Sequence, residues 1–435
     1  MGGGFLLAVL GRLDFVNGPW FHKWLFRDLS VAATAALFFP SLLAIAWALR
    51  QAEGPAPRAR GPLLALTAAH LGLLLAGVLA EPLLFEKVRR IVVSANATSY
   101  FTDATRVQHL GTWLAGFHEA DLELHSSTHP PGPILFYYVL IRVLGEGPAA
   151  LAGGALVGVA ASAGIPLLYA FASLWTSDVR TRLTACAVYA LGPGLIVFLP
   201  EMDQVYPLLS MGLMLCWARG AAGDDRMSLG FGATLFVATL FAYNLLVLGL
   251  FVVGHAAWRL VRARGAGAAW KEQARAAGLG LGAFFALHLL FAFATGYAPV
   301  RSLLHALEIQ AGHAKGQDRP YLYCVLFNLY DFFLGAGILA FPLLLQHAER
   351  TFRSLSADDD AGAMTLIGLG TILGVNFSGL LNAETARVWL FLQPLLAVPV
   401  ALQLRRYSTA SRALSFALFA VVLIVVKARL EFILP

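Results

Sequence analysis

Charged residues are scarce in this chain. Asp, Glu, Lys and Arg make up 13% of its 435 residues, whereas hydrophobic residues make up 59%. Soluble domains carry a charged fraction of about a quarter, so this composition excludes an ordinary water-soluble fold. The sequence therefore predicts a polytopic membrane protein.

Cysteine is also rare. Cys186, Cys216 and Cys324 all fall within or at the ends of apolar stretches, where cysteine usually serves as a small core residue. Neither a disulfide framework nor a cysteine metal site is predicted. The net charge of +6 could suggest a nucleic-acid partner. However, the basic residues are scattered over short segments without a basic helix, so nucleic acid is not a predicted partner.

Long apolar stretches are abundant. A helix of about 17 to 25 apolar residues crosses a hydrocarbon core of about 30 Å. Helices are required because an unpaired backbone amide costs several kcal/mol in lipid. The predicted fold is therefore all-α, a polytopic transmembrane bundle formed by residues 1–435 as one domain, with 1–28 as an interfacial amphipathic segment. About twelve spans are expected, near 29–49, 62–85, 148–175, 183–200, 204–219, 228–243, 244–262, 277–295, 322–345, 362–381, 388–404 and 412–430.

The distribution of basic residues predicts the orientation. More than half of the 31 Lys and Arg residues lie in short segments near 50–60, 180–182, 219–226, 259–275, 350–353 and 405–412. The positive-inside rule assigns these segments to the cytoplasm. Segments 86–147 and 296–321 then face the outside. Richness in Ala, Gly and Leu suggests a bacterial inner membrane.

Segment 86–147 gathers polar groups that a membrane bundle does not need. Residues 103–119 repeat apolar groups at spacings of three and four, which predicts a helix on the membrane surface. Proline is well tolerated in the first turn of a helix, so Pro130-Pro131 predicts a second one over 134–140. The two helices flank Asp103 and His129.

These motifs resemble the GT-C superfamily. The chain has an acidic residue near the start of an outer loop, a His129-Pro130-Pro131 motif leading into aromatic residues, and a Pro200-x-x-Asp203 turn. GT-C proteins are polytopic glycosyltransferases that use polyprenyl-phosphate-linked sugars, and they include protein O-mannosyltransferases and aminoarabinose transferases. The resemblance covers roughly 96–219, and the motif 384–389 is similar to bacterial members.

The resemblance implies an inverting transfer from a polyprenyl-phosphate donor to a lipid, glycan or protein acceptor, with Asp103 as the catalytic acid. Many members have an Asp-Glu pair where this chain has Asp103-Ala104. The resemblance thus allows a divalent metal cofactor without requiring one. It also identifies the lipid bilayer as the place of reaction.

Sugar transfer also suggests roles from chemistry alone. A carboxylate can take the acceptor proton, and a guanidinium matches the geometry of a leaving phosphate. Asp103 and His129 are therefore the predicted catalytic residues. The predicted substrate-binding residues are Asp203, Glu384, Arg387, Tyr137 and Arg106.

Structural explanations compete with these roles. Asp103 or Asp203 could simply cap a helix, and Glu384 and Arg387 have the spacing of an ion pair. His305 and His313 on segment 296–321 fit a solvated helix face better than a metal site.

Two other functional classes stay open. One is a transporter or flippase, for which the buried Asp331 would be the first residue to consider. The other is a polysaccharide polymerase or ligase.

Overall fold

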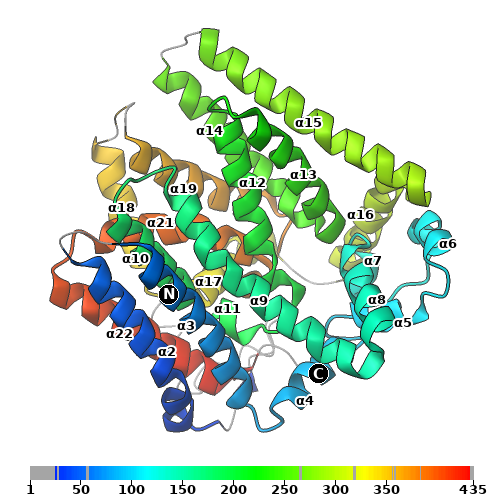
Figure 1. Cartoon of the computed structure of the whole chain (residues 1–435), viewed down its shortest axis with the longest axis horizontal. Helices are drawn as coiled ribbons and strands as arrows, with labels where there is room; N and C mark the ends of the chain where they lie inside the picture. The colour runs from blue at the N-terminus through cyan, green and yellow to red at the C-terminus, as the bar shows by residue number, and fades with distance from the viewer. Residues whose placement is uncertain are drawn as a thin grey trace.

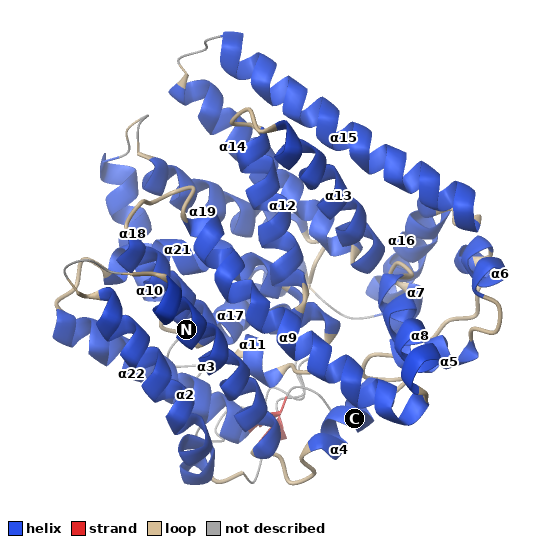
Figure 2. Cartoon of the chain, in the orientation of Figure 1, coloured by secondary structure: helices blue, strands red, loops and turns tan. Residues whose placement is uncertain are grey.

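The computed structural model describes residues 25–26, 29–54, 58–263, 267–316, 320–354, 356, 359–382 and 384–431. Within these ranges the chain is a helical bundle (Figures 1 and 2) with one two-residue ladder, formed by β1 (Leu25–Phe26) and β2 (Leu430–Glu431). The predicted all-α fold is confirmed. Most of the predicted interfacial segment, 1–24 and 27–28, lies outside the described residues.

Fewer helices than the predicted twelve have the length and composition of a membrane span among the described residues. In the described part of the chain, seven helices are long and apolar enough to cross a membrane. An eighth span is possible if α17 (Tyr321–Ala336) and α18 (Ala340–Ser354), which meet at 107°, count as one. The expectation of about twelve is not confirmed. The seven are α2 (Val31–Ala52), α3 (Arg60–Leu79), α9 (Glu146–Ala172), the run Tyr243–Arg262 formed by η3 (Tyr243–Leu248) and α14 (Gly249–Arg262), α15 (Gly267–Thr295), α19 (Asp360–Ser378) and α22 (Thr409–Arg429).

The other predicted spans are short or broken helices. Apolar backbone may break at membrane depth where surrounding protein buries it, and hydropathy does not register such breaks. Segment 183–200, for example, divides at Gly192-Pro193. The elements concerned are α10 (Val179–Ala190), α11 (Gly194–Val197), α12 (Tyr206–Gly220), α13 (Asp225–Phe241), η4 (Leu390–Leu392) and α21 (Gln393–Leu404).

The outer segment contains several small helices. The predicted continuous helix over 103–119 is wrong, because the extended backbone at Val107 and His109 separates two helices, and a 3-10 turn follows after Gly116. A helix does begin directly after Pro130-Pro131, as predicted. The elements are α4 (Phe85–Val93), α5 (Tyr100–Arg106), α6 (Leu110–Ala115), η1 (Phe117–Glu119), α7 (Leu124–Ser127) and α8 (Gly132–Leu144); segment 296–321 is largely α16 (Pro299–Gly316).

Three of the predicted cytoplasmic loops meet at one end of the bundle. Glu53, which follows α2, pairs with Arg405 and lies 3.1 Å from Arg412. Arg405 is also 3.9 Å from Asp178, which caps α10. Loops that are distant in sequence but share one compartment should meet in this way, so these contacts support the predicted grouping of the loops.

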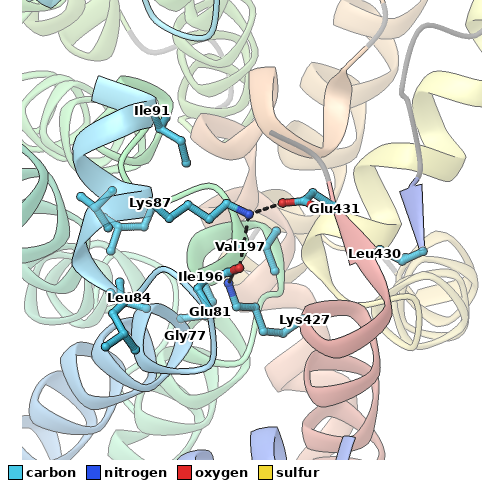
Figure 3. Close-up of a pocket in the computed structure, with 13 residues that line it drawn as sticks. Gly77, Glu81, Leu84, Lys87, Ile91, Ile196, Val197, Lys427, Leu430 and Glu431 are labelled. Atoms are coloured by element: carbon cyan, nitrogen blue, oxygen red, sulfur yellow. Dashed lines mark hydrogen bonds and ion pairs between the residues drawn. The ribbon is translucent and has the colours of Figure 1, made fainter. Parts of the chain in front are cut away.

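A charged cluster ties the end of α3 to the end of α22 (Figure 3). Lys427 Nζ of α22 lies 2.6 Å from Glu81 Oε1, just after α3, and both residues are 6% exposed. Lys87 of α4 pairs with both Glu81 and Glu431. The cavity that these residues line is small, about 30 Å³. The charge of Lys87 is thereby matched by two carboxylates.

This cluster allows a test of stability. We expect Lys427→Met to lower the free energy of unfolding by about 3–5 kcal/mol, because it leaves a buried carboxylate short of one cation. Thermal unfolding in detergent would measure the change. The double variant Glu81→Leu, Lys427→Met should recover much of the loss, and an unchanged melting temperature in the single variant would contradict a stabilising role.

Candidate functional site

Arg387 lies at the centre of the candidate site, on the one-turn helix α20 (Thr385–Val388). Asp331 of α17 holds this turn, because its Oδ2 accepts the N–H of Ala386 at 2.8 Å and the hydroxyl of Thr385 at 3.3 Å. Asp331 is fully buried. Asp331 is the first residue to consider for a transporter. In this structure it contacts the backbone that positions Arg387.

Three carboxylates surround the Arg387 guanidinium. Glu384 Oε2 lies 2.6 Å from Nη2, Glu201 Oε2 lies 3.4 Å from Nη1, and Asp203 Oδ2 lies 3.7 Å from Nε. Glu201 and Asp203 come from the turn η2 (Met202–Gln204) and the residue before it. The Arg387 side chain is 13% exposed. If every group is charged, the cluster carries two more negative than positive charges.

The protonation of Glu201 moderates this excess. Burial raises its pKa to about 8 against the opposing effect of Arg387, and the neighbouring Asp203 and Glu384 raise it further. Its Oε1 has no hydrogen-bond partner among the described residues. Burial alone would lower the pKa of Arg387, but the three carboxylates raise it above its usual range. Arg387 therefore stays charged, while Glu201 is largely neutral at neutral pH.

Two histidines border this cluster. His129 Nδ1 lies 2.7 Å from the carbonyl oxygen of His125. A carbonyl can only accept, so Nδ1 carries the proton and Nε2 keeps its lone pair. Burial lowers the pKa of His129, and the charges of Asp203 and Arg387 also act on its ring. The edge of Tyr100 packs against this ring at 5.5 Å. His129 is thus a neutral imidazole of defined tautomer.

His125 is the second imidazole of the site. Burial lowers its pKa to about 4, and the positive charge of Arg387 contributes in the same direction. Because it lies on α7, four residues before His129, its carbonyl and its ring both belong to the candidate site. His125 is neutral at neutral pH.

Asp103 lies on α5 and faces the turn at α7. Its carboxylate is 1% exposed; Oδ1 lies 3.2 Å from Arg106 Nη1, and Oδ2 accepts the N–H of Glu123 at 3.2 Å. Burial raises its pKa, and a hydrogen bond from Ser126 lowers it. Arg106 in turn lies 2.6 Å from Glu123. Asp103 and Arg106 therefore fasten the loop that carries His125.

Tyr137 is a core residue in this structure. It is 1% exposed and packs edge-on against Phe101 at 5.6 Å and Phe136 at 5.0 Å. A Cβ added at Gly153 of α9 would lie 2.4 Å from the Tyr137 ring, so α8 and α9 approach closely here. The charge of Glu201 acts on the Tyr137 hydroxyl, so this core ring packs near the site.

The structure brings together Asp203, Glu384, Arg387 and His129 from the sequence-predicted set, and it adds Glu201 and His125. Both additions had a signal, since Glu201 is two residues from Asp203 and His125 is one helical turn from His129. Among the described residues, no group of three or more His, Cys, Asp or Glu is arranged to hold a metal ion. The side chain of His313 lies outside the described residues.

Comparison with known proteins shows the fold. No family model matches the chain. No curated protein matches it either. A solved structure that resembles it is that of ArnT from Cupriavidus metallidurans bound to undecaprenyl phosphate, with a TM-score of 0.54 and 14% sequence identity. The match covers 82% of this chain and 62% of the ArnT chain. The chain thus has an all-α membrane fold similar to that of ArnT.

Proposed function

We propose that this chain is a membrane glycosyltransferase. It moves a sugar from a polyprenyl-phosphate donor to an acceptor hydroxyl on the extracytoplasmic face of a bacterial inner membrane. The observation that carries the proposal is the buried Arg387 together with the neutral His129, whose ring lies within the electrostatic influence of Arg387. The solved ArnT structure that shares this fold is bound to undecaprenyl phosphate, which supports a lipid-phosphate donor.

The reaction is a direct displacement. The acceptor oxygen attacks the anomeric carbon of the sugar, the bond from that carbon to the phosphate oxygen breaks, and the polyprenyl phosphate leaves with the electron pair. The acceptor proton passes to a base in the site. Attack opposite to the leaving group inverts the anomeric configuration.

Arg387 binds the donor phosphate in this proposal. Glu384 makes the shortest contact with the guanidinium, yet its side chain is 37% exposed, whereas that of Glu201 is 3% exposed. Glu384 is therefore the carboxylate that the phosphate can replace at least cost. A guanidinium can then hold two phosphate oxygens side by side. Protonation of Glu201 reduces the repulsion that an arriving phosphate meets.

Two groups compete for the role of base. The sequence favours Asp103, but each of its oxygens has a partner in the loop. His129 has an Nε2 lone pair and lies within the field of Arg387. The geometry favours His129 as the base, with Asp103 holding the loop. Asp203 and Glu201 complete the wall around the guanidinium.

Asp103→Asn separates the two assignments. Asparagine can still accept the N–H of Glu123 but cannot take a proton. If Asp103 holds the loop, we expect the transfer rate to fall by less than about tenfold. A loss of about 10²-fold or more in a well-folded variant would make Asp103 the base instead. Initial rates in nanodiscs would be measured, with Thr105→Ala on the same helix as the control.

Donor binding tests the proposed function before the sugar is known. Undecaprenyl phosphate should raise the melting temperature of the wild-type protein, and Arg387→Ala should lose this effect. A donor panel with varied sugars should then yield free polyprenyl phosphate.

Two outcomes favour the alternative functions. If proteoliposomes move an intact lipid-linked sugar across the bilayer without breaking a bond, the transporter alternative is correct. If the product is a lengthened or ligated polysaccharide, the polymerase or ligase alternative is correct.

A further inference from the structure

A polar pocket that shares no residue with the candidate site lies where the end of α18, the start of α19 and the end of α21 meet. The three helices are neighbours in the bundle (Figure 1). The cavity volume is about 100 Å³, enough for a group larger than a single water molecule. The residues that matter here are His347, Arg350, Arg406, Asp359 and Gly362.

The charge of the lining is predominantly positive. Arg350 and Arg406 face one carboxylate, that of Asp359. Asp359 Oδ1 accepts the N–H of Gly362 at 2.9 Å and so acts as the N-cap of α19. Within the described ranges, neither arginine forms an ion pair; Arg350 Nη1 donates to Gln403 at 3.0 Å. Among the described residues, the positive charges of Arg350 and Arg406 are therefore not neutralised by an ion pair.

His347 provides an independent sign of a ligand. It is 5% exposed and lines the pocket, and neither of its ring nitrogens has a hydrogen-bond partner among the described residues. A buried polar group without a partner is costly, and native structures seldom leave one. The N-terminus of the 19-residue helix α19 opens onto the same space and favours negative charge. One nitrogen of a neutral imidazole donates, so one of the two missing partners is an acceptor of hydrogen bonds.

We infer that this pocket binds a phosphate group. Arg350 and Arg406 supply the charge, His347 donates from one ring nitrogen, and the first turn of α19 completes the site. Positively charged loops surround it, so the site lies on the predicted cytoplasmic side. The inference is independent of the proposed sugar transfer. The phosphate is either the headgroup of an anionic phospholipid or a free phosphorylated molecule.

Thermal unfolding of the full-length protein tests this inference. In a neutral detergent, inorganic phosphate should raise the melting temperature more than chloride of equal ionic strength. Arg406→Gln should weaken the apparent affinity at least tenfold. Arg353→Gln is the control, because Arg353 lies on α18 but does not line the pocket, is 77% exposed and pairs with Glu349. The control variant should respond like the wild type.

A second variant tests whether a lost response to phosphate comes from misfolding. His347→Phe removes the unpartnered polar group, so it should keep or raise the basal melting temperature while weakening the response to phosphate.

Nanodiscs that contain phosphatidylglycerol or phosphatidylcholine distinguish the two sources of phosphate, a lipid headgroup and a free molecule. Protection by phosphatidylglycerol, without a response to inorganic phosphate, assigns the site to a lipid headgroup. No response to either probe, or equal losses in Arg353→Gln and Arg406→Gln, would overturn the inference.

Discussion

Arg387→Ala is expected to abolish sugar transfer and to destabilise the protein. The substitution leaves Glu201, Asp203 and Glu384 facing one another without their cation. Removing one partner from a buried ion pair costs about 3–5 kcal/mol. Loss of the phosphate-binding group should lower the turnover rate by about 10²–10³-fold. Both effects can be measured on one purified sample in nanodiscs.

Two further variants separate stability from function. Adding Asp203→Asn to Arg387→Ala removes one of the carboxylates left without a cation, so it should restore part of the melting temperature without restoring transfer. Arg387→Lys keeps the charge but loses the paired donors, and we expect an intermediate donor affinity. An unchanged donor affinity in both Arg387→Lys and Arg387→Ala would refute the phosphate role. Arg387 would then be a purely structural residue.

His129→Gln is expected to reduce the transfer rate by about 10²–10⁴-fold, the usual contribution of a general base. The glutamine amide can still donate to the carbonyl of His125, but it cannot take a proton. The matched control is His125→Gln, which keeps that carbonyl and should cost far less. Wild-type rates in His129→Gln would eliminate His129 and return the role to Asp103.

The pH dependence gives a second measurement of the same assignment. The base works when its imidazole is neutral, so the rate should fall as the pH drops through its pKa. Because burial lowers the pKa of His129, this fall should begin below the ordinary histidine value of about 6.5. His129→Gln should remove this acid limb from its residual activity. An acid limb that is unchanged in the variant would contradict the assignment.

Elements whose structure follows from one local rule were predictable from the sequence. Pro130-Pro131 predicted the start of α8, and apolar composition predicted a helical membrane bundle. Helix breaks that depend on tertiary packing were not predictable from the sequence. The extended backbone at Val107 and His109 breaks a run that has helical periodicity. The break at Gly192-Pro193 is tolerated because the protein interior surrounds it, and a hydropathy window cannot register that burial.

The candidate site was partly predictable for the same reason. Motif positions identified Arg387, Asp203 and His129, since each belongs to a recognisable polar turn. Their mutual distances depend on how α20 and η2 pack, which requires Asp331 of α17 to hold α20. Glu201 was missed because its importance comes from burial beside Arg387, and a sequence does not show burial.

The pair Glu81–Lys427 has a consequence for biosynthesis. Its two residues are 346 positions apart. At translation rates of about 5–20 residues per second, roughly 17 to 70 seconds separate their emergence from the ribosome. During that interval α3 enters the bilayer while the ammonium group of Lys427 is still absent. Until then Lys87 is the cation available to Glu81, and α3 gains its contact with Lys427 only when α22 arrives.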